Sequence, residues 1–205
     1  YMSYITEAIN KWGKCRTGAI TMYGAGVGVY GNSGYAYTGS TPSKLKKRIE
    51  EANSSNAEIT DINITENGNY VIILGGSGYW TLGYPDAFLK KLEQYRTGDL
   101  RDDNILSACF NDRGEWVVIT DKHYSYSNET IKNFILKAEE LYEEVYYAYI
   151  TNYGMIACCK NGVYYKNIPS NLAEALKKLT FKPKVIKFTD NGLYLITDGE
   201  YKIIF

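Results

Sequence analysis

The sequence repeats one pattern five times, and this repeat constrains the fold more than any other feature of the chain. Each copy reads as a strand, a polar turn with a glycine, and a strongly apolar second strand. The copies share 205 residues, which is about 41 residues per copy. Glycine suits the turn because a tight hairpin needs a positive φ there. The turn glycines are predicted to be Gly26, Gly68, Gly114, Gly154 and Gly192.

A third short strand and a helix complete each copy. Turns with Asn-Gly or Asp-Gly, which favour hairpins, precede two of the third strands, at residues 161–162 and 198–199. The third strands are expected at residues 34–37, 78–81, 123–126, 162–165 and 199–202. Amphipathic helices follow four of them, at residues 42–52, 85–95, 128–142 and 169–179, and three of these helices are expected to begin with Pro. Each unit is therefore predicted to be a three-stranded antiparallel meander followed by a helix.

The two ends of the chain divide the fifth unit between them. Phe205 comes directly after the last third strand, and the chain opens with an amphipathic helix at residues 3–12 that no strand precedes. An open solenoid needs polar end caps, whereas a closed ring joins its own ends. We therefore expect the first helix to pack on the last sheet. The contacting residues should be Ile5, Ile9 and Trp12 in the helix and Leu193, Leu195 and Ile203 in the sheet.

Together these features predict an α+β fold, a closed pseudo-fivefold ring of propeller-like layout. Three-stranded antiparallel meanders form the ring, each followed by an outer helix, and the N-terminal helix completes the C-terminal unit. The whole chain, 1–205, is predicted to be a single repeat domain. Its units span about residues 19–57, 58–101, 102–142, 143–180, and 181–205 completed by 1–18. The alternative is an unrelated α+β domain whose hairpins resemble one another by chance.

The predicted layout resembles that of the five-repeat α/β propellers of the guanidino-modifying enzymes. The resemblance is one of architecture alone, because the chain has no WD dipeptide and no kelch glycine pair. An enzyme of that kind would need a Cys, a His and acidic partners around the centre of the ring.

Composition narrows the range of partners. The 23 Lys and Arg residues balance 23 Asp and Glu residues, which argues against the basic face that nucleic-acid binding requires. The apolar runs are too short to span a membrane, and no signal-like segment opens the sequence. We therefore expect a protein, small-molecule or sugar partner, without nucleic acid or membrane. A cytoplasmic chain is expected, with a mature secreted chain as the alternative, and the sequence does not predict the oligomeric state.

The sequence offers few groups for catalysis or metal binding. Four cysteines occur without a C-x-x-C motif, and we expect them to be reduced, with at least one of Cys158 and Cys159 buried. His123 is the sole histidine and stands where other third strands begin with Gly, so we expect it to be exposed, unpaired and not catalytic. No metal site and no cofactor are predicted, and the calcium-loop spacing is absent. The glycine-rich segment 24–31 looks like a nucleotide loop, but the repeat places a hairpin there and a helix only at Pro42, so we interpret it as a crowded or bulged strand pair. Carboxylates occur in turns, where turn chemistry explains them first; they are Glu66, Asp112, Asp121, Asp190 and Asp198.

Tyrosine is the unusual component, with 21 residues in the chain. Its apolar ring and polar tip suit binding surfaces, although packing between sheet and helix is the other interpretation. The predicted ligand-binding residues on the third strands are Tyr35, Tyr37, Tyr79, Trp80, Tyr124, Tyr126, Tyr164, Tyr165 and Tyr201. We expect a non-enzymatic binding or protein-interaction scaffold. The alternatives are a lectin-like carbohydrate-binding module and an enzyme that combines His123 with a Cys or a carboxylate at the ring centre.

Overall fold

A computed structural model describes residues 2–200 and 202–205 and has a mixed α+β fold. The described residues form five helices and five separate three-stranded antiparallel sheets. The helices are α1 (Ser3–Trp12), α2 (Ser43–Ser55), α3 (Asp86–Arg96), α4 (Glu129–Tyr142) and α5 (Ser170–Lys177). The strands of the first three sheets are β1 (Thr17–Ile20), β2 (Gly26–Tyr30), β3 (Gly34–Tyr37), β4 (Ile59–Ile64), β5 (Tyr70–Leu74), β6 (Gly78–Leu82), β7 (Ile105–Phe110), β8 (Trp116–Thr120) and β9 (Tyr124–Tyr126). The remaining strands are β10 (Val145–Ile150), β11 (Met155–Cys159), β12 (Gly162–Lys166), β13 (Val185–Phe188), β14 (Tyr194–Thr197) and β15 (Ile203–Ile204).

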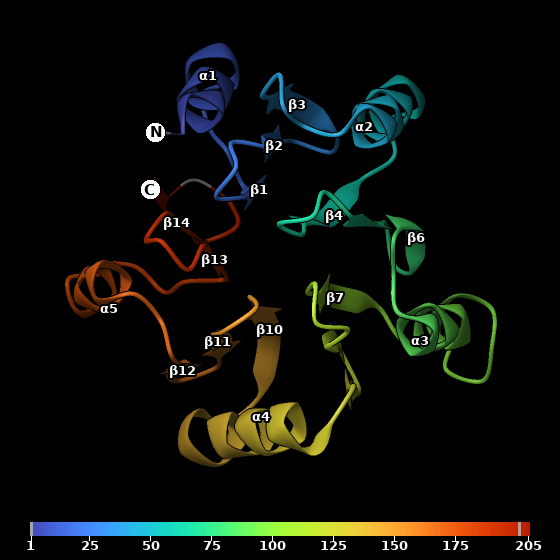
Figure 1. Cartoon of the computed structure of the whole chain (residues 1–205), viewed down its shortest axis with the longest axis vertical. Coiled ribbons are helices and arrows are strands. Elements are labelled where there is room, and N and C mark those ends of the chain that lie inside the picture. Colours follow the sequence, from blue (N-terminus) through green and yellow to red (C-terminus); the bar gives the residue numbers. More distant parts are fainter. Residues whose placement is uncertain (1, 201) are drawn as a thin grey trace.

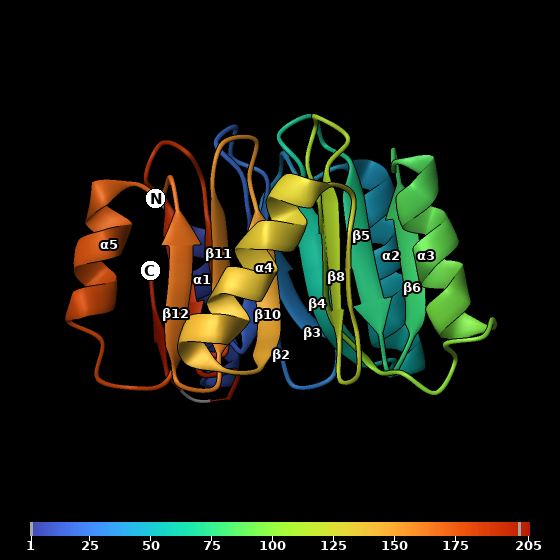
Figure 2. The same cartoon turned by 90° about the horizontal axis from the view of Figure 1, so that it is seen from below.

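Every sheet is a meander whose second strand lies between the first and the third. Figure 1 shows the sheets around a common centre, with the first strand of each sheet nearest that centre and the helices outside. Figure 2 shows the strands running side by side, with α3, α4 and α5 on the outer surface. The first strands of neighbouring sheets contact one another in the order β1, β4, β7, β10 and β13, and β13 also contacts β1. None of the helices described is long and apolar enough to cross a membrane.

Three of the five first strands, β4, β7 and β10, share an irregularity at equivalent positions of the repeat. The register with the second strand shifts between Ile59 and Asp61 in β4, and it shifts at the equivalent places in β7 and β10. Such a bulge adds one residue to one strand and increases the local twist. Asp61, Ser107 and Tyr147 directly follow these shifts and are all buried. The bulges therefore help to set which side chains meet at the centre.

The first unit differs from the prediction in its turn glycine. Gly24 has the left-handed conformation, with φ +97°, that Gly68, Gly114 and Gly192 also adopt. Gly26 instead begins β2 opposite Ile20, so its prediction as the turn glycine is wrong. Gly154 does not have the positive φ that was expected, so that prediction is also wrong. Glycine is required there for another reason: an added Cβ would lie 2.4 Å from the carbonyl oxygen of Asn167.

The helix α1 explains why β2 is rich in glycine. A Cβ added at Gly26 would lie 2.2 Å from Cζ of Tyr4, and one added at Gly28 would lie 3.2 Å from Cβ of Ala8. Without side chains at these two positions, α1 lies directly on the backbone of β2. The glycine-rich segment is therefore a docking surface for the helix, which agrees with its interpretation as a strand pair rather than a nucleotide loop.

The helix α1 also packs against the last sheet. Ile5 and Ala8 are fully buried in a cluster that contains Leu195 of β14, with Ile9 and Ile203 at its edge. Two of the contacts expected for this helix differ. Trp12 stacks on Tyr30 of the first sheet, with ring centroids 4.0 Å apart, and Leu193 lies outside the cluster. Figure 1 accordingly shows α1 between the first and the last sheet.

The position of the last strand and the starts of three helices differ from the prediction. The last third strand is Ile203–Ile204 rather than residues 199–202, and Tyr201 lies outside the described residues. Pro42, Pro85 and Pro169 occupy the N-cap position, one residue before the first helical residue. Their ψ angles of 137°, 140° and 146° are extended, which is the usual backbone of an N-cap residue.

We predict that Gly26→Ala destabilises the protein by about 1–3 kcal/mol, the usual cost of overpacking a core. Tyr4 is buried, so its ring cannot swing away from the new methyl group without displacing α1. Gly39→Ala is the matched control, because an added Cβ there meets nothing within 4 Å and no positive φ is involved. Urea unfolding of the two variants and the wild type measures the effect. Equal stability of Gly26→Ala and Gly39→Ala would contradict the docking of α1 on β2.

Candidate functional site

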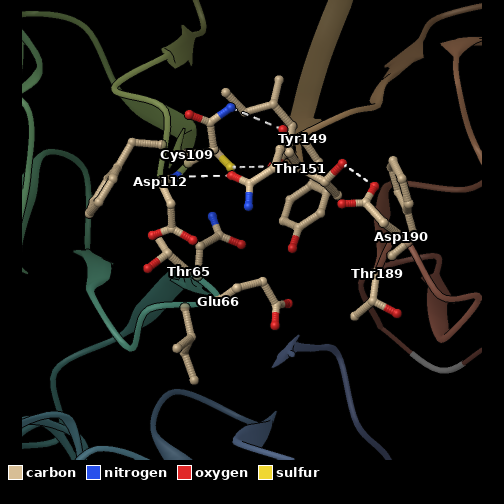
Figure 3. A pocket seen from close by; sticks show the side chains of 15 residues that line it. Thr65, Glu66, Cys109, Asp112, Tyr149, Thr151, Thr189 and Asp190 are labelled. Atoms are coloured by element: carbon tan, nitrogen blue, oxygen red, sulfur yellow. Dashed lines mark hydrogen bonds between the residues drawn. The ribbon is translucent and has the colours of Figure 1, made fainter. Parts of the chain in front are cut away.

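The first turns of the second to fifth units meet at one end of the molecule and line a small, partly open polar pocket, here called the central pocket. Its volume is about 30 Å³, and its lining comes from the ends of β4, β7, β10 and β13 and from the turns that follow them. Figure 3 shows the lining side chains converging from these four elements. The polar ones used below are Asn63, Glu66, Asp112, Tyr149, Asn152 and Asp190.

The repeat places polar residues at equivalent positions in this pocket. Glu66, Asp112, Asn152 and Asp190 each stand two residues before the glycine of their turn, and the first unit has Met22 there. The sequence identified three of these residues as turn carboxylates, but only the arrangement of the sheets brings them to one place. Four units therefore contribute an acceptor to the central pocket, whereas no residue of the first unit lines it.

The same four residues hold neighbouring turns together. Both carboxylate oxygens of Glu66 accept from the backbone N–H of Met22, at 3.0 and 2.9 Å. Asp112 accepts from the N–H of Asn67 at 3.2 Å, and its own N–H donates to Asn152 at 3.0 Å. Asp190 accepts from the Thr151 hydroxyl at 2.7 Å. Each acceptor thus binds the turn of the preceding unit, so these residues connect the units as well as line the pocket.

The central pocket is electronegative. None of its 15 lining residues carries a positive charge, and three of them are carboxylates. Burial, and then the nearby carboxylates Asp112 and Asp190, raise the pKa of Glu66, although its bond from Met22 acts in the opposite direction. The ring of Tyr149 points between Glu66 and Asp190 in Figure 3, and burial raises the pKa of its hydroxyl. The pocket can therefore offer carboxylate, amide and hydroxyl oxygens to a positively charged donor.

A buried ion pair lies beneath the pocket. Lys187 of β13 and Asp61 of β4 are fully buried, and Nζ lies 3.1 Å from Oδ1. Asp61 also accepts from the Tyr147 hydroxyl at 2.7 Å and from the Ala108 N–H at 3.2 Å. Burial lowers the pKa of Lys187, and the neighbouring Asp61 carboxylate opposes that shift.

Sequence reasoning missed this ion pair, although one signal was present. Lys187 interrupts the apolar strand Val-Ile-Lys-Phe and stands five residues before its turn glycine, at the position that Asn63, Cys109 and Tyr149 occupy in other units. All four residues are buried. A charged residue at an inward-facing repeat position indicates a buried partner, because an unpaired buried charge is very costly.

Most of the predicted ligand-binding tyrosines lie on the outer strands and contact helices. Tyr37 donates to Glu50 of α2 at 2.7 Å, and Tyr79 donates to Glu93 of α3. The Tyr124 hydroxyl accepts from the N–H of Val145 at 2.9 Å.

The other predicted residues are placed in a similar way. Tyr35 stacks on Tyr37, Tyr164 packs against Phe134 of α4, and Tyr126 is half-buried against the α4 cluster. The guanidinium of Arg48 lies 4.8 Å from the ring centroid of Trp80. Tyr165 is the exposed member of this set, and Tyr201 lies outside the described residues. The structure does not bring these residues together at one site, and their binding of a ligand stays a prediction.

His123 is exposed, as expected, but it has a partner that was not expected. Its Nδ1 lies 2.6 Å from Oδ2 of Asp103, which also accepts from the Thr120 hydroxyl at 2.7 Å. Burial alone would raise the pKa of Asp103, but the bonds from His123 and Thr120 outweigh it and hold that pKa below its ordinary value. The expectation that His123 is unpaired is therefore wrong, because the loop after α3 brings Asp103 beside the start of β9.

The pairing of β7 with β8 separates His123 from the cysteine that lines the central pocket. Cys109 pairs with Val117, whereas His123 follows the far end of β8, where Thr120 pairs with Ile105. All four cysteines are free and buried, in agreement with the prediction for Cys158 and Cys159. Burial raises the pKa of Cys15 and Cys159 to about 11 and that of Cys109 to about 12. These thiols are therefore protonated at neutral pH.

Comparison with known proteins adds no family assignment: the chain matches no protein-family model and no curated protein.

We predict that Lys187→Met costs about 3–5 kcal/mol of stability, because it leaves Asp61 as a buried charge without its cation. Lys178→Met, which alters an exposed lysine, should change stability by less than about 0.5 kcal/mol. Denaturant unfolding measures both variants. The double variant Asp61→Asn/Lys187→Met should lose less than the two single variants together, since the charges are removed as a pair. A fully additive double variant would contradict the coupling of the two charges.

We also predict that a thiol reagent labels the native protein slowly at pH 8. The thiols are buried and have raised pKa values, so little thiolate is present and little of it is reachable. Mass spectrometry after timed alkylation gives the rate for each cysteine, and labelling in urea is the control. Rapid labelling of all four native cysteines, or a linked Cys158–Cys159 pair, would contradict the prediction.

Proposed function

We propose that the protein is a closed, pseudo-fivefold, propeller-like domain that acts as a non-enzymatic binding scaffold, with the central pocket as its site. Two observations support closure of the ring. The first strands contact their neighbours in an uninterrupted cycle. The helix α1 shares one apolar cluster with the last sheet, so the N-terminal segment completes the C-terminal unit.

The observation that carries the binding proposal is the convergence of polar side chains from four units on one small pocket. Binding sites characteristically combine a concave shape with a few convergent polar groups. Exposed aromatic residues stand in the same set of turns: Tyr23 of the first unit is 43% exposed and Tyr153 of the fourth unit is 71% exposed. A partner that enters the central pocket would therefore find two exposed tyrosines in neighbouring turns.

The other functions considered receive less support. An enzyme would combine His123 with a Cys or a carboxylate at the ring centre. Cys109 stands near the opposite end of the β7–β8 pair from His123. The carboxylate that does pair with His123, Asp103, is not among the residues that line the central pocket, and neither is His123. A lectin-like module would need free aromatic faces, whereas Trp80 and most third-strand tyrosines contact helices or their side chains. Four free thiols also support a reducing compartment such as the cytoplasm.

We predict that ligands of this scaffold bind at the central pocket. A panel of free amino acids, monosaccharides and short peptides is screened by thermal shift and then by NMR titration. Binding should raise the melting temperature of the wild type, and the gain should disappear in Glu66→Gln/Asp190→Asn. Tyr165→Ala is the control, because it alters an exposed tyrosine on the outer strand β12.

Two results would overturn the proposal. One is a ligand whose binding survives the pocket variant but is lost in Tyr165→Ala or in a Trp80 variant, which would favour the lectin-like alternative. The other is chemical conversion of a bound compound, which would favour an enzyme.

A further inference from the structure

We propose that the central pocket binds a primary ammonium group, as carried by a lysine side chain or by a free alkylamine. The inference rests on the binding function proposed above and specifies its ligand. It follows from the charge of the pocket, from acceptor atoms that lack donors, and from the size of the cavity.

The negative charge of the residues that line the central pocket favours a positively charged ligand. Glu66, Asp112 and Asp190 line the central pocket and no basic residue does. The nearest compensated pair lies below it, where Lys187 is bonded to Asp61 and to the carbonyl oxygen of Ile62. The ammonium of Lys187 is therefore already bonded below the pocket and does not neutralise the carboxylates that line it. An anion in the pocket would face three carboxylates, whereas a cation would face none of its own sign among the lining residues.

Asn63 supplies an independent observation. The residue is 5% exposed and lines the central pocket, yet its side-chain oxygen Oδ1 has no hydrogen-bond partner. Its Nδ2 donates to the carbonyl oxygen of Ala108 at 2.7 Å and to Oδ2 of Asp61 at 3.1 Å. The opposite amide orientation would set Oδ1 against these two acceptors, so the orientation is fixed. Oδ1 is thus the atom left for the pocket, and it needs a donor.

A second acceptor atom of the pocket also lacks a hydrogen-bond donor. Oδ1 of Asp112 is buried and has no partner, while Oδ2 accepts from the N–H of Asn67. Native proteins leave few buried polar atoms unpaired, and each one calls for an explanation. Two such acceptors, from two different units, line one pocket of carboxylates. A ligand that carries several N–H donors would satisfy both.

The size of the pocket favours an ammonium group over larger cations. A volume of about 30 Å³ admits only one or two groups of the size of a water molecule. A primary ammonium is of that size and presents three donors, whereas a trimethylammonium group is larger and presents none. The described residues contain no group of three His, Cys, Asp or Glu side chains placed to hold a metal ion. The hydroxyl of Tyr149, which points into the pocket, adds a further acceptor for the ammonium.

The test compares three probes of equal chain length by calorimetry and NMR titration of the full chain: n-pentylamine, its N,N,N-trimethyl analogue and 1-pentanol. We expect pentylamine to bind and to shift the resonances of Asn63 and Tyr149. The two other probes should bind at least about tenfold more weakly, which corresponds to the loss of one charged hydrogen bond. Equal binding of the trimethyl analogue or of pentanol would overturn the proposal.

Variants locate the site. Asp190→Asn and Glu66→Gln remove one charge each and keep an oxygen that can accept from Thr151 and Met22. Each should weaken pentylamine binding about tenfold. Glu140→Gln is the matched control, because it removes the same charge from a side chain that is 69% exposed on α4. Melting temperatures confirm that the variants are folded. Unchanged binding in folded Asp190→Asn would overturn the proposal.

Two further arms separate the possible outcomes. Comparison of Nα-acetyl-lysine methylamide with pentylamine distinguishes a lysine of a protein partner from a free amine, and tighter binding of either one supports the ammonium site. If the panel of amino acids, sugars and peptides yields a neutral or anionic ligand at the central pocket while no amine binds, the ammonium inference fails and the binding function stands. If nothing binds at the central pocket, both fail.

Discussion

The carboxylate of Asp61 is the point on which the centre of the structure depends. It belongs to the second sheet and accepts from Ala108 of the third, Tyr147 of the fourth and Lys187 of the fifth. A buried carboxylate is costly to take out of water, and so is a buried ammonium, so each requires the other and the remaining bonds as well. A shift of the second sheet relative to the fifth would separate the two charges, and a shift of the third or fourth sheet would remove a hydrogen bond from the buried carboxylate. One side chain therefore fixes the relative positions of four sheets, whose apolar packing is less directional.

The repeat and its exceptions have different roles. Residues common to all units build the meanders, the turns and the apolar contacts with the helices. The residues that depart from the repeat occur where one unit makes a contact that the other units do not make. Gly26 and Gly28 replace side chains so that α1 can lie on β2, and Lys187 replaces an uncharged residue so that Asp61 has its counter-ion. A perfectly regular repeat would have neither the docking surface for the N-terminal helix nor the ion pair at the centre.

The carboxylates of the central pocket both connect neighbouring units and provide acceptor atoms for a ligand. Glu66, Asp112 and Asp190 each accept a bond from the preceding unit, which uses some of their oxygens and fixes their positions. The bonds also place three carboxylates close together, where their mutual repulsion and burial act on Glu66. Such an arrangement holds acceptors rigidly in place before any ligand arrives, which lowers the cost of ordering them on binding. Tyr149 and Asn63 complete it from the strands beneath the turns.

The sequence by itself determined the elements: five meanders, four following helices and an N-terminal helix can be read from periodicity, turn glycines and prolines, because these signals are local. It also indicated that at least one of Cys158 and Cys159 is buried, and the structure buries both. The sequence also led us to predict ligand binding by the tyrosines of the third strands. Composition does not reveal which way a side chain points, and the tertiary structure turns most of these tyrosines toward helices. The central pocket and the Lys187–Asp61 pair depend on residues far apart in the chain, such as Asp61 and Lys187, which are 126 positions apart. Only the packing of the sheets brings such residues together, because spacing along the sequence does not record which strands face one another.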